Sequence, residues 1–287
     1  MTHTGRRTFT YLLVYGIICL LVILAIIPFI SLVVELISHG LESFNLDFFT
    51  QTSPPPTDTL LMRNDQDSIS FGIKNGIYGS FLLIVIATVI AVPIGIGCSL
   101  YIFMNRSNPV AKWVNYINSV IYGMPSVLIG IIVYLAIEKP MHDLTSLSAG
   151  IALAIILLPF IVFTTLKALL RVPNELIRAG LALGATYPSV VWKVVLPTIK
   201  KTMIAGWLRG IARVAGETAP LIITLIGSPA INWNLLHSTN AVPLLIWDFL
   251  NKPSFSSLVW SSALFLFLFV LILCTIANYI DDEKLST

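Results

Sequence analysis

The chain has 287 residues, of which 56% are hydrophobic and only 11% charged, and its formal net charge is +3. Its mean hydropathy is +0.90. Soluble globular domains carry about a quarter charged residues. This composition therefore excludes a soluble protein and favours one that spans a bilayer, with membrane lipid around it. The small net charge gives no reason to expect a nucleic-acid partner.

Six apolar runs are long enough to cross the hydrocarbon core, which is about 30 Å thick, as helices that rise about 1.5 Å per residue. They cover residues 12–37, 76–104, 117–137, 147–169, 202–226 and 257–280. The first run is too long for the core of a signal peptide, so we expect it to remain as a transmembrane helix. The sequence thus predicts an all-α polytopic membrane protein with six transmembrane helices.

Lysines and arginines predict the orientation of these helices, because cytoplasmic segments are enriched in them. If the N-terminus is cytoplasmic, the inner segments hold Arg6, Arg7, Arg106, Lys112, Lys167, Arg171, Arg178, Lys193, Lys200, Lys201 and Lys284. The outer segments hold Arg63, Lys74, Lys139 and Lys252, beside the acidic residues Glu42, Asp47, Asp58, Asp65 and Asp67. We therefore expect both termini in the cytoplasm.

This orientation divides the chain into parts. We expect a cytoplasmic tail at 1–11, the first helix at 12–37, an extracytoplasmic loop at 38–72, a five-helix core at 73–280 and a cytoplasmic tail at 281–287. The core contains a cytoplasmic loop at 170–201. Cys19, Cys98 and Cys274 lie far apart in apolar runs, and the sequence has no CxxC motif or Cys/His cluster. It therefore predicts no metal site.

The loop at 170–201 has the pattern of two short helices. Pro173 precedes a helical start, Gly184 interrupts the pattern, and Pro188 is typical of the first turn of another helix. Two interpretations stay open from these residues alone. The helices lie on the surface of an anionic membrane, or they project and dock into a cytoplasmic partner.

The same loop resembles the signature loop of permeases from binding-protein-dependent ABC importers. Gly184 is followed after nine residues by Val194-Val195-Leu196-Pro197, which is similar to the G-x9-I-x-L-P pattern of that family. Ala179-Gly180 stands where the family has Ala-Ala, but Arg178 replaces the usual Glu, for which Glu175 is a candidate substitute. The resemblance implies a type I importer permease of MetI-like architecture, whose coupling helix inserts into an ATP-binding subunit. The implied coupling residues are Glu175, Arg178, Ala179, Gly180, Leu183, Gly184, Leu196 and Pro197, with Gly184 permitting the close turn.

Further stretches resemble the phosphate permeases of this family, namely residues 72–80, 93–97, 123–130 and 215–221. This resemblance implies four kinds of partner: a second homologous permease, a dimer of ATP-binding subunits, an extracytoplasmic phosphate-binding protein, and phosphate itself. It also implies the plasma membrane of a bacterium or archaeon. The chain has no P-loop. We therefore expect no cofactor of its own and no enzymatic activity, with ATP used by the partner subunit.

Charged residues inside the predicted fifth span are the candidate substrate site. Arg209, Arg213 and Glu217 follow one another at i, i+4 and i+8, so a continuous helix would present them on one face. An arginine at the centre of a membrane helix costs about 2.5–3.5 kcal/mol on insertion scales, so this face should avoid lipid. One interpretation is a structural cluster of neutralising charges. The other is an anion pathway, because guanidinium binds phosphate oxygens in a bidentate manner, with Thr218 as an additional donor.

The hypothesis that follows is the permease subunit of an ATP-driven phosphate importer. In the phosphate permeases the matching arginine and glutamate are linked to substrate passage, and the resemblance carries this to Arg213 and Glu217. One alternative is a permease for phosphonate, sulfate or molybdate. Another is a gradient-driven secondary transporter, which is expected to have several embedded carboxylates, whereas Glu217 is the one near mid-span. A membrane-embedded enzyme is less favoured, since no catalytic set of residues converges on a span.

Overall fold

A computed structural model describes residues 3–54 and 71–282 of the chain, and every regular element in these ranges is helical. The elements are α1 (His3–Gly40), α2 (Leu46–Thr50), α3 (Lys74–Met104), α4 (Pro109–Gly123), α5 (Ser126–Val133), the π-helical turn η2 (Tyr134–Glu138), α6 (Lys139–Met141), α7 (Ser146–Leu170), α8 (Asn174–Ala182), α9 (Tyr187–Val190), the π-helical turn η3 (Val191–Val195), α10 (Leu196–Ala215), α11 (Ala219–Thr224), α12 (Val242–Leu250), the 3-10 turn η4 (Pro253–Phe255) and α13 (Ser256–Asp282). Arg63, Lys284, Asp58, Asp65 and Asp67 lie outside the described residues, as do the side chains of Arg6 and Arg7.

Four of the predicted spans are confirmed as long apolar helices. Tyr11–Gly40, Lys74–Met104, Ser146–Leu170 and Pro253–Asp281 are each long and apolar enough to cross a membrane. They correspond to the first, second, fourth and sixth predicted runs. The four helices begin or end within a few residues of the predicted limits, because long apolar runs leave the backbone no alternative to internal hydrogen bonding in lipid.

The third predicted span is not one straight helix. Residues 109–141 form two helical segments that meet at an angle of 105°, with the break after Gly123. Met124 has ψ 138° and Pro125 has ψ 134°, both outside the helical range. The proline explains the break, since it pushes the preceding residue into an extended conformation. The expectation of a continuous helix at 117–137 was therefore wrong.

The fifth predicted span is likewise interrupted. Helix α10 ends at Ala215, Gly216 follows as its C-cap, and the chain re-enters a helix only at Ala219, with Pro220 in the first turn of α11. The structure therefore corrects the expected helix at 202–226 to a longer helix, a short break and a short helix. A helix rarely continues through a glycine followed closely by a proline, because the proline removes one hydrogen bond and clashes with the preceding turn.

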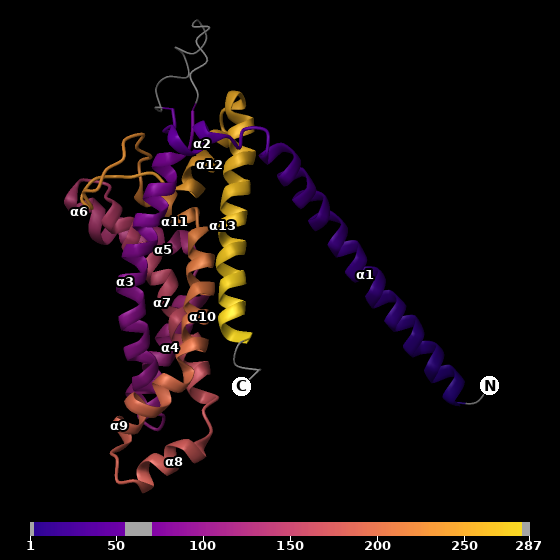
Figure 1. Cartoon of the computed structure of the whole chain (residues 1–287), viewed down its shortest axis with the longest axis vertical. Coiled ribbons are helices and arrows are strands. Elements are labelled where there is room, and N and C mark those ends of the chain that lie inside the picture. Colours follow the sequence, from indigo (N-terminus) through magenta and orange to yellow (C-terminus); the bar gives the residue numbers. More distant parts are fainter. Residues whose placement is uncertain (1–2, 55–70, 283–287) are drawn as a thin grey trace, which may run out of the picture.

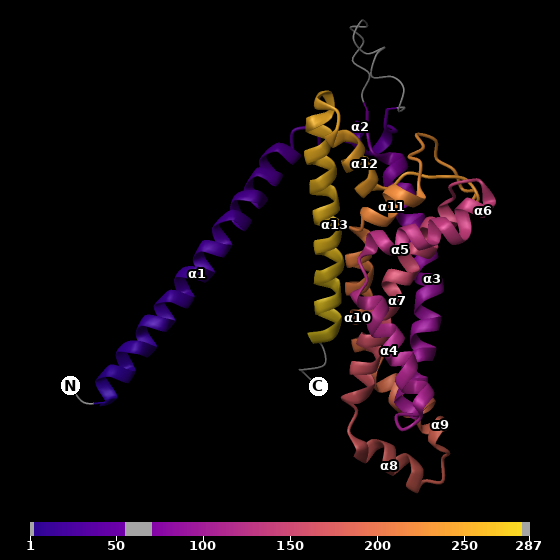
Figure 2. The ribbon, with the colours of Figure 1, turned by 180° about the vertical axis from the view of Figure 1, so that it is seen from behind.

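Helix α1 leans away from the remaining helices, which form a bundle around α7 (Figures 1 and 2). It meets the bundle near its C-terminal end, where the Ser261 hydroxyl of α13 donates a 2.8 Å hydrogen bond to the carbonyl of Gly40. A side chain at position 40 would collide with Leu264, whose nearest atoms lie 2.8 Å from the Cβ position. Glycine therefore allows this close crossing of α1 and α13.

The bundle core depends on close packing of α3 against α7. A Cβ atom at Gly95 would lie 2.6 Å from Ile161, and one at Gly150 would lie 2.4 Å from Ile86. Buried alanines of both helices join the same core cluster. Small residues let membrane helices approach closely, and this close approach provides the van der Waals contacts that stabilise the helix pair.

Both described termini and the α8–α9 segment lie at one end of the molecule, and α2 and α12 lie at the other (Figure 1). This arrangement follows from the interrupted helices, each of which still carries the chain from one end to the other. It places His3, Asp282 and the predicted coupling loop on the same side.

Candidate functional site

The two interrupted helices meet at one cavity. The first break lies at Met124–Pro125 between α4 and α5, and the second lies at Gly216–Thr218 between α10 and α11. Helix α5 packs tightly on α11, since a Cβ atom at Gly130 would lie 2.9 Å from the Cα atom of Pro220. This contact holds the two breaks beside each other. Non-helical backbone at membrane depth is tolerated where it lines a cavity.

The cavity has a volume of about 250 Å³, and two of the predicted site residues, Arg213 and Glu217, line it. It is lined by Ile121, Tyr122, Met124, Pro125, Ser126, Ile129, Ile156, Arg213 and Glu217. Apolar side chains thus surround one guanidinium, one carboxylate and two hydroxyl groups. Such a mixture is typical of a site for a small polar ligand.

Arg213 is the principal cation of this cavity. Its guanidinium carbon lies 5.5 Å from the centre of the Tyr122 ring, which is a cation–π distance. Within the described part of the chain the guanidinium forms no hydrogen bond or ion pair. Its N–H groups are therefore available for an anion, which guanidinium binds through two parallel hydrogen bonds.

Glu217 shares the cavity with Arg213 but not the helix. The predicted common helical face of Arg209, Arg213 and Glu217 was wrong, because α10 ends two residues before Glu217. The backbone N–H of Glu217 donates a 3.1 Å hydrogen bond to the carbonyl of Val214, which continues the turn at the helix end. Among the described residues no ion pair joins its carboxylate to Arg213. The carboxylate and the guanidinium therefore line the same cavity without an ion pair between them.

The structure does not bring Arg209 or Thr218 into this cavity. The Arg209 guanidinium donates hydrogen bonds to Asn278 Oδ1 at 3.0 Å and to Asp281 Oδ2 at 2.9 Å, so it joins α10 to α13. Thr218 occupies the N-cap position of α11, and its carbonyl accepts a 3.1 Å hydrogen bond from Ile222. Neither residue lines the cavity that holds Arg213 and Glu217, and their predicted place in the substrate pathway stays a prediction.

Sequence reasoning missed Tyr122 and Ser126 as cavity residues. Ser126 is the first residue of α5, where the leading N–H groups of a helix have no partner within the helix. Such an end favours negative charge. The available signal was Pro125 inside an apolar run, which marks a break. It does not tell on which side the neighbouring side chains lie.

The predicted coupling loop projects as a separate feature at the far end of the bundle (Figure 1). Gly184 has φ +82°, the left-handed conformation that glycine adopts without strain, and it turns the chain between α8 and α9. Leu183 is 89% exposed. Glu175, Arg178 and Ala179 are also exposed, so these side chains are free to contact a partner.

Other predicted coupling residues hold the loop together. A Cβ atom at Gly180 would lie 2.8 Å from Val190, so α8 packs directly on α9 there. Leu196 is half-buried against the neighbouring cluster, and Pro197 lies in the first turn of α10. The second short helix does not stand apart as expected, because α9 continues through η3 into α10. The loop therefore continues without a break into the helix that carries Arg213.

Residues 91–283 match the family described as "Binding-protein-dependent transport system inner membrane component". The chain belongs to this family. As a family member with several apolar helices, it is a multi-pass membrane protein. The family name and the ABC transporters below imply that such a permease works with a binding protein and an ATP-binding subunit.

Several proteins related to this chain are named as phosphate transport permeases. The chain is 33% identical over 246 residues to "Phosphate transport system permease protein PstA" of Xylella fastidiosa (strain 9a5c), covering 83% of this chain and 80% of the relative. It is 30% identical over 241 residues to the PstA of Haemophilus influenzae, covering 83% and 82%. It is 29% identical over 273 residues to the "Probable phosphate transport system permease protein PstA" of Methanocaldococcus jannaschii, covering 92% of both.

Solved structures confirm the fold of this family member. The chain superimposes on a protein from the inward-facing MetNI methionine ABC transporter with a TM-score of 0.56 and 18% identity, covering 72% of this chain and 91% of the other. It also superimposes on an amino acid ABC transporter with histidines, with a TM-score of 0.52 and 16% identity, covering 73% and 94%. The predicted ABC importer permease architecture is therefore confirmed.

Proposed function

We propose that this chain is the permease subunit of an ATP-driven inorganic phosphate importer. Relatives named as phosphate permeases cover most of its length, in bacteria and in an archaeon. One chemical observation supports the proposal most directly. The guanidinium of Arg213, which has no hydrogen bond or ion pair among the described residues, lies in a cavity between two interrupted helices.

The cavity suits brief binding of an oxyanion. Arg213 supplies a permanent charge and two parallel donors, and the start of α5 at Ser126 adds unpartnered backbone N–H groups. Glu217 reduces the net attraction from within the same cavity. A translocation pathway needs binding that is weak enough for release.

A second permease completes the pathway in this proposal. Arg213 is exposed in the isolated chain, and Tyr122 is 47% exposed. Helices α4 and α5 beside them present a wide apolar surface that includes Trp113, Ile117, Val120, Leu128 and Ile132. Apolar surface that borders a polar cavity is better covered by a homologous, PstC-like subunit than by lipid, because lipid would also meet the guanidinium.

The energy comes from a PstB-like dimer of ATP-binding subunits that receives the α8–α9 loop. The chain uses no cofactor of its own and catalyses no reaction. Closure of the dimer pushes the loop, and the continuous path through η3 and α10 carries the movement to Arg213. Both described ends of the chain and the loop share one end of the molecule, which we assign to the cytoplasm of a bacterial or archaeal plasma membrane. A PstS-like phosphate-binding protein delivers phosphate at the opposite end.

Substitution of Arg213 tests this function against a matched control on the same helix. Arg213→Gln removes the charge and the donor pair, so we expect loss of phosphate uptake in proteoliposomes that contain the complete importer. Arg209→Gln removes an equal charge that contacts α13 instead, so we expect most of the uptake to remain. Normal uptake by an assembled Arg213→Gln importer would contradict the proposal.

Competition identifies the transported oxyanion. Uptake of labelled phosphate is measured with an excess of unlabelled phosphate, phosphonate, sulfate or molybdate. We expect competition by phosphate alone. Stronger transport of one of the other anions would favour the alternative permease over the phosphate permease.

A further inference from the structure

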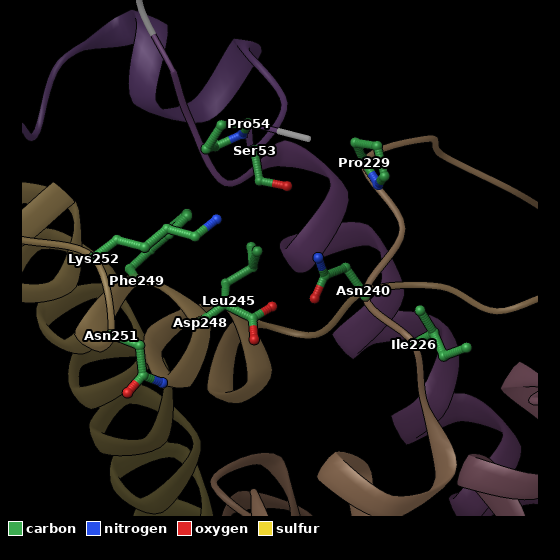
Figure 3. Close-up of a pocket in the computed structure, with 11 residues that line it drawn as sticks. Ser53, Pro54, Ile226, Pro229, Asn240, Leu245, Asp248, Phe249, Asn251 and Lys252 are labelled. Atoms are coloured by element: carbon green, nitrogen blue, oxygen red, sulfur yellow. The ribbon is translucent and has the colours of Figure 1, made fainter. Parts of the chain in front are cut away.

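The end of the molecule opposite α8 contains a second cavity, of about 360 Å³, which we call the outer pocket (Figure 3). It is lined by Ser53, Pro54, Ile226, Gly227, Pro229, Asn240, Leu245, Asp248, Phe249, Asn251 and Lys252. These residues come from three separate parts of the chain: the end of the α2 segment, the stretch after α11, and α12 with the residues after it. None of the site residues predicted from the sequence lies in it.

A buried amide fixes the walls of the outer pocket. Asn75, at the start of α3, is 1% exposed. Its Oδ1 accepts a hydrogen bond from Ser53 N at 3.0 Å, and its Nδ2 donates to Ser53 Oγ at 2.8 Å and to the carbonyl of Ser228 at 2.9 Å. Gly79 allows the backbone of Asn240 to pack directly on α3. The pocket is therefore already formed without a ligand, which lowers the entropy cost of binding.

An unpaired carboxylate faces this preformed space. Asp248 points into the outer pocket beside the amide of Asn240 (Figure 3). Among the described residues it forms no hydrogen bond or ion pair. Burial raises the pKa of Asp248, and the charge of Lys252 lowers it. The Lys252 ammonium itself lies 5.9 Å from the centre of the Phe255 ring. The carboxylate is thus partly removed from water, and no cation of the described residues contacts it, which is unfavourable until one arrives.

We propose that the outer pocket receives a lysine or arginine side chain of the extracytoplasmic binding protein, which forms an ion pair with Asp248. The inference rests on the proposed function, which places this end of the molecule outside the cell. Charge complementarity selects a cationic group. The pocket is walled by connecting segments and by the short helix α12, not by the long apolar helices that face lipid. Its position therefore favours a protein partner over a lipid headgroup.

Gly227 keeps the pocket open. A Cβ atom there would lie 3.1 Å from Asn240 Nδ2 and 3.2 Å from Asp248 Oδ2, between the two groups that an incoming cation would contact. Its φ is not positive, so the backbone accepts a larger residue. A side chain at 227 would fill the pocket while the charge of Asp248 remains, which separates loss of space from loss of charge.

The test measures docking of the purified phosphate-loaded binding protein to the complete importer in lipid nanodiscs. We expect Asp248→Asn to raise the Kd at least about tenfold, as for a partly desolvated charge pair, and Gly227→Val to do the same. Asp143→Asn is the matched control, because it removes an equal charge from an exposed residue outside the outer pocket, and its Kd should equal that of the wild type. Size-exclusion chromatography verifies that each variant assembles.

Phosphate uptake separates failure of this inference from failure of the proposed function. With saturating binding protein, uptake by Asp248→Asn should return to the wild-type rate, whereas uptake by Arg213→Gln should not. A wild-type Kd for both Asp248→Asn and Gly227→Val would overturn the inference, even if the wild-type importer transports phosphate. It would equally be overturned if Asp248→Asn only released phosphatidylethanolamine from the nanodiscs with docking unchanged.

Discussion

The buried amide of Asn75 joins segments of this protein that are distant in sequence. Asn75 forms hydrogen bonds to two segments that are distant in sequence, one at Ser53 and one at Ser228. All of its polar atoms are used, and it lies at the start of α3, where a buried polar group without a partner would be costly. Its role follows from these three hydrogen bonds and not from its residue type, since asparagines are common elsewhere in the chain.

Replacement of Asn75 tests this role. Asn75→Leu leaves the N–H of Ser53 without its partner in a buried position, which costs about 1–3 kcal/mol, so we expect a lower midpoint of thermal unfolding in detergent. Asn105→Leu is the control, because the Asn105 side chain donates a single, exposed hydrogen bond to Tyr101. Equal unfolding midpoints for the two variants would show that the hydrogen bonds of Asn75 contribute no stability.

The α8–α9 loop is an element whose geometry depends on one backbone angle. Gly184 has φ +82° and no atom within 4 Å of its Cβ position, so a side chain there meets backbone strain and no steric clash. A non-glycine residue in the left-handed region costs about 1–2 kcal/mol, and asparagine tolerates it better than most. The strain would act on the segment that we assign to contact with the ATP-binding subunits.

The positive φ of Gly184 predicts that different substitutions at this position reduce activity by different amounts. We expect Gly184→Ala to reduce ATP hydrolysis stimulated by the binding protein several-fold, and Gly184→Asn to reduce it less. Gly16→Ala serves as a control, because Gly16 lies in α1 with no atom near its Cβ position and alanine favours a helix. If alanine and asparagine at 184 behaved alike, the backbone conformation would not be what the loop requires.

On the scale of the whole molecule, α1 is separate from the folded core. None of the three hydrophobic clusters includes a residue of α1. Its main contact is with α13 near Gly40. Helix α13, by contrast, packs along α10 and α12 and supplies Asn278 and Asp281 to Arg209. The two terminal helices therefore contribute unequally to folding.

Truncation tests this difference. A chain that begins at Leu41 should keep its helical circular dichroism in detergent and unfold within a few degrees of the full chain, because its core clusters are intact. A chain that ends at Phe255 should lose cooperative unfolding, because α10 and α12 lose the helix on which they pack. Unfolding of the first truncated chain would show that α1 belongs to the core.

The sequence by itself determined the class of the protein, four of its long helices and the position of the turn at Gly184, because long apolar runs and glycine act through local chemistry. It also showed that Pro125 and Pro220 lie within predicted spans, but not how the chain would bend there. Only the tertiary structure set the angle of 105° after Gly123 and brought α5 against α11.

The two arginines of α10 are a second case in which the sequence alone could not predict the contacts. Their spacing of four residues places them on nearly one face of the helix, so the sequence could not separate them. Tertiary packing separates the two arginines, because α13 provides Asn278 and Asp281 for Arg209, while the break beside Tyr122 leaves Arg213 in a cavity. Long flexible side chains go to the partners that neighbouring helices provide, and those neighbours are fixed only by the fold.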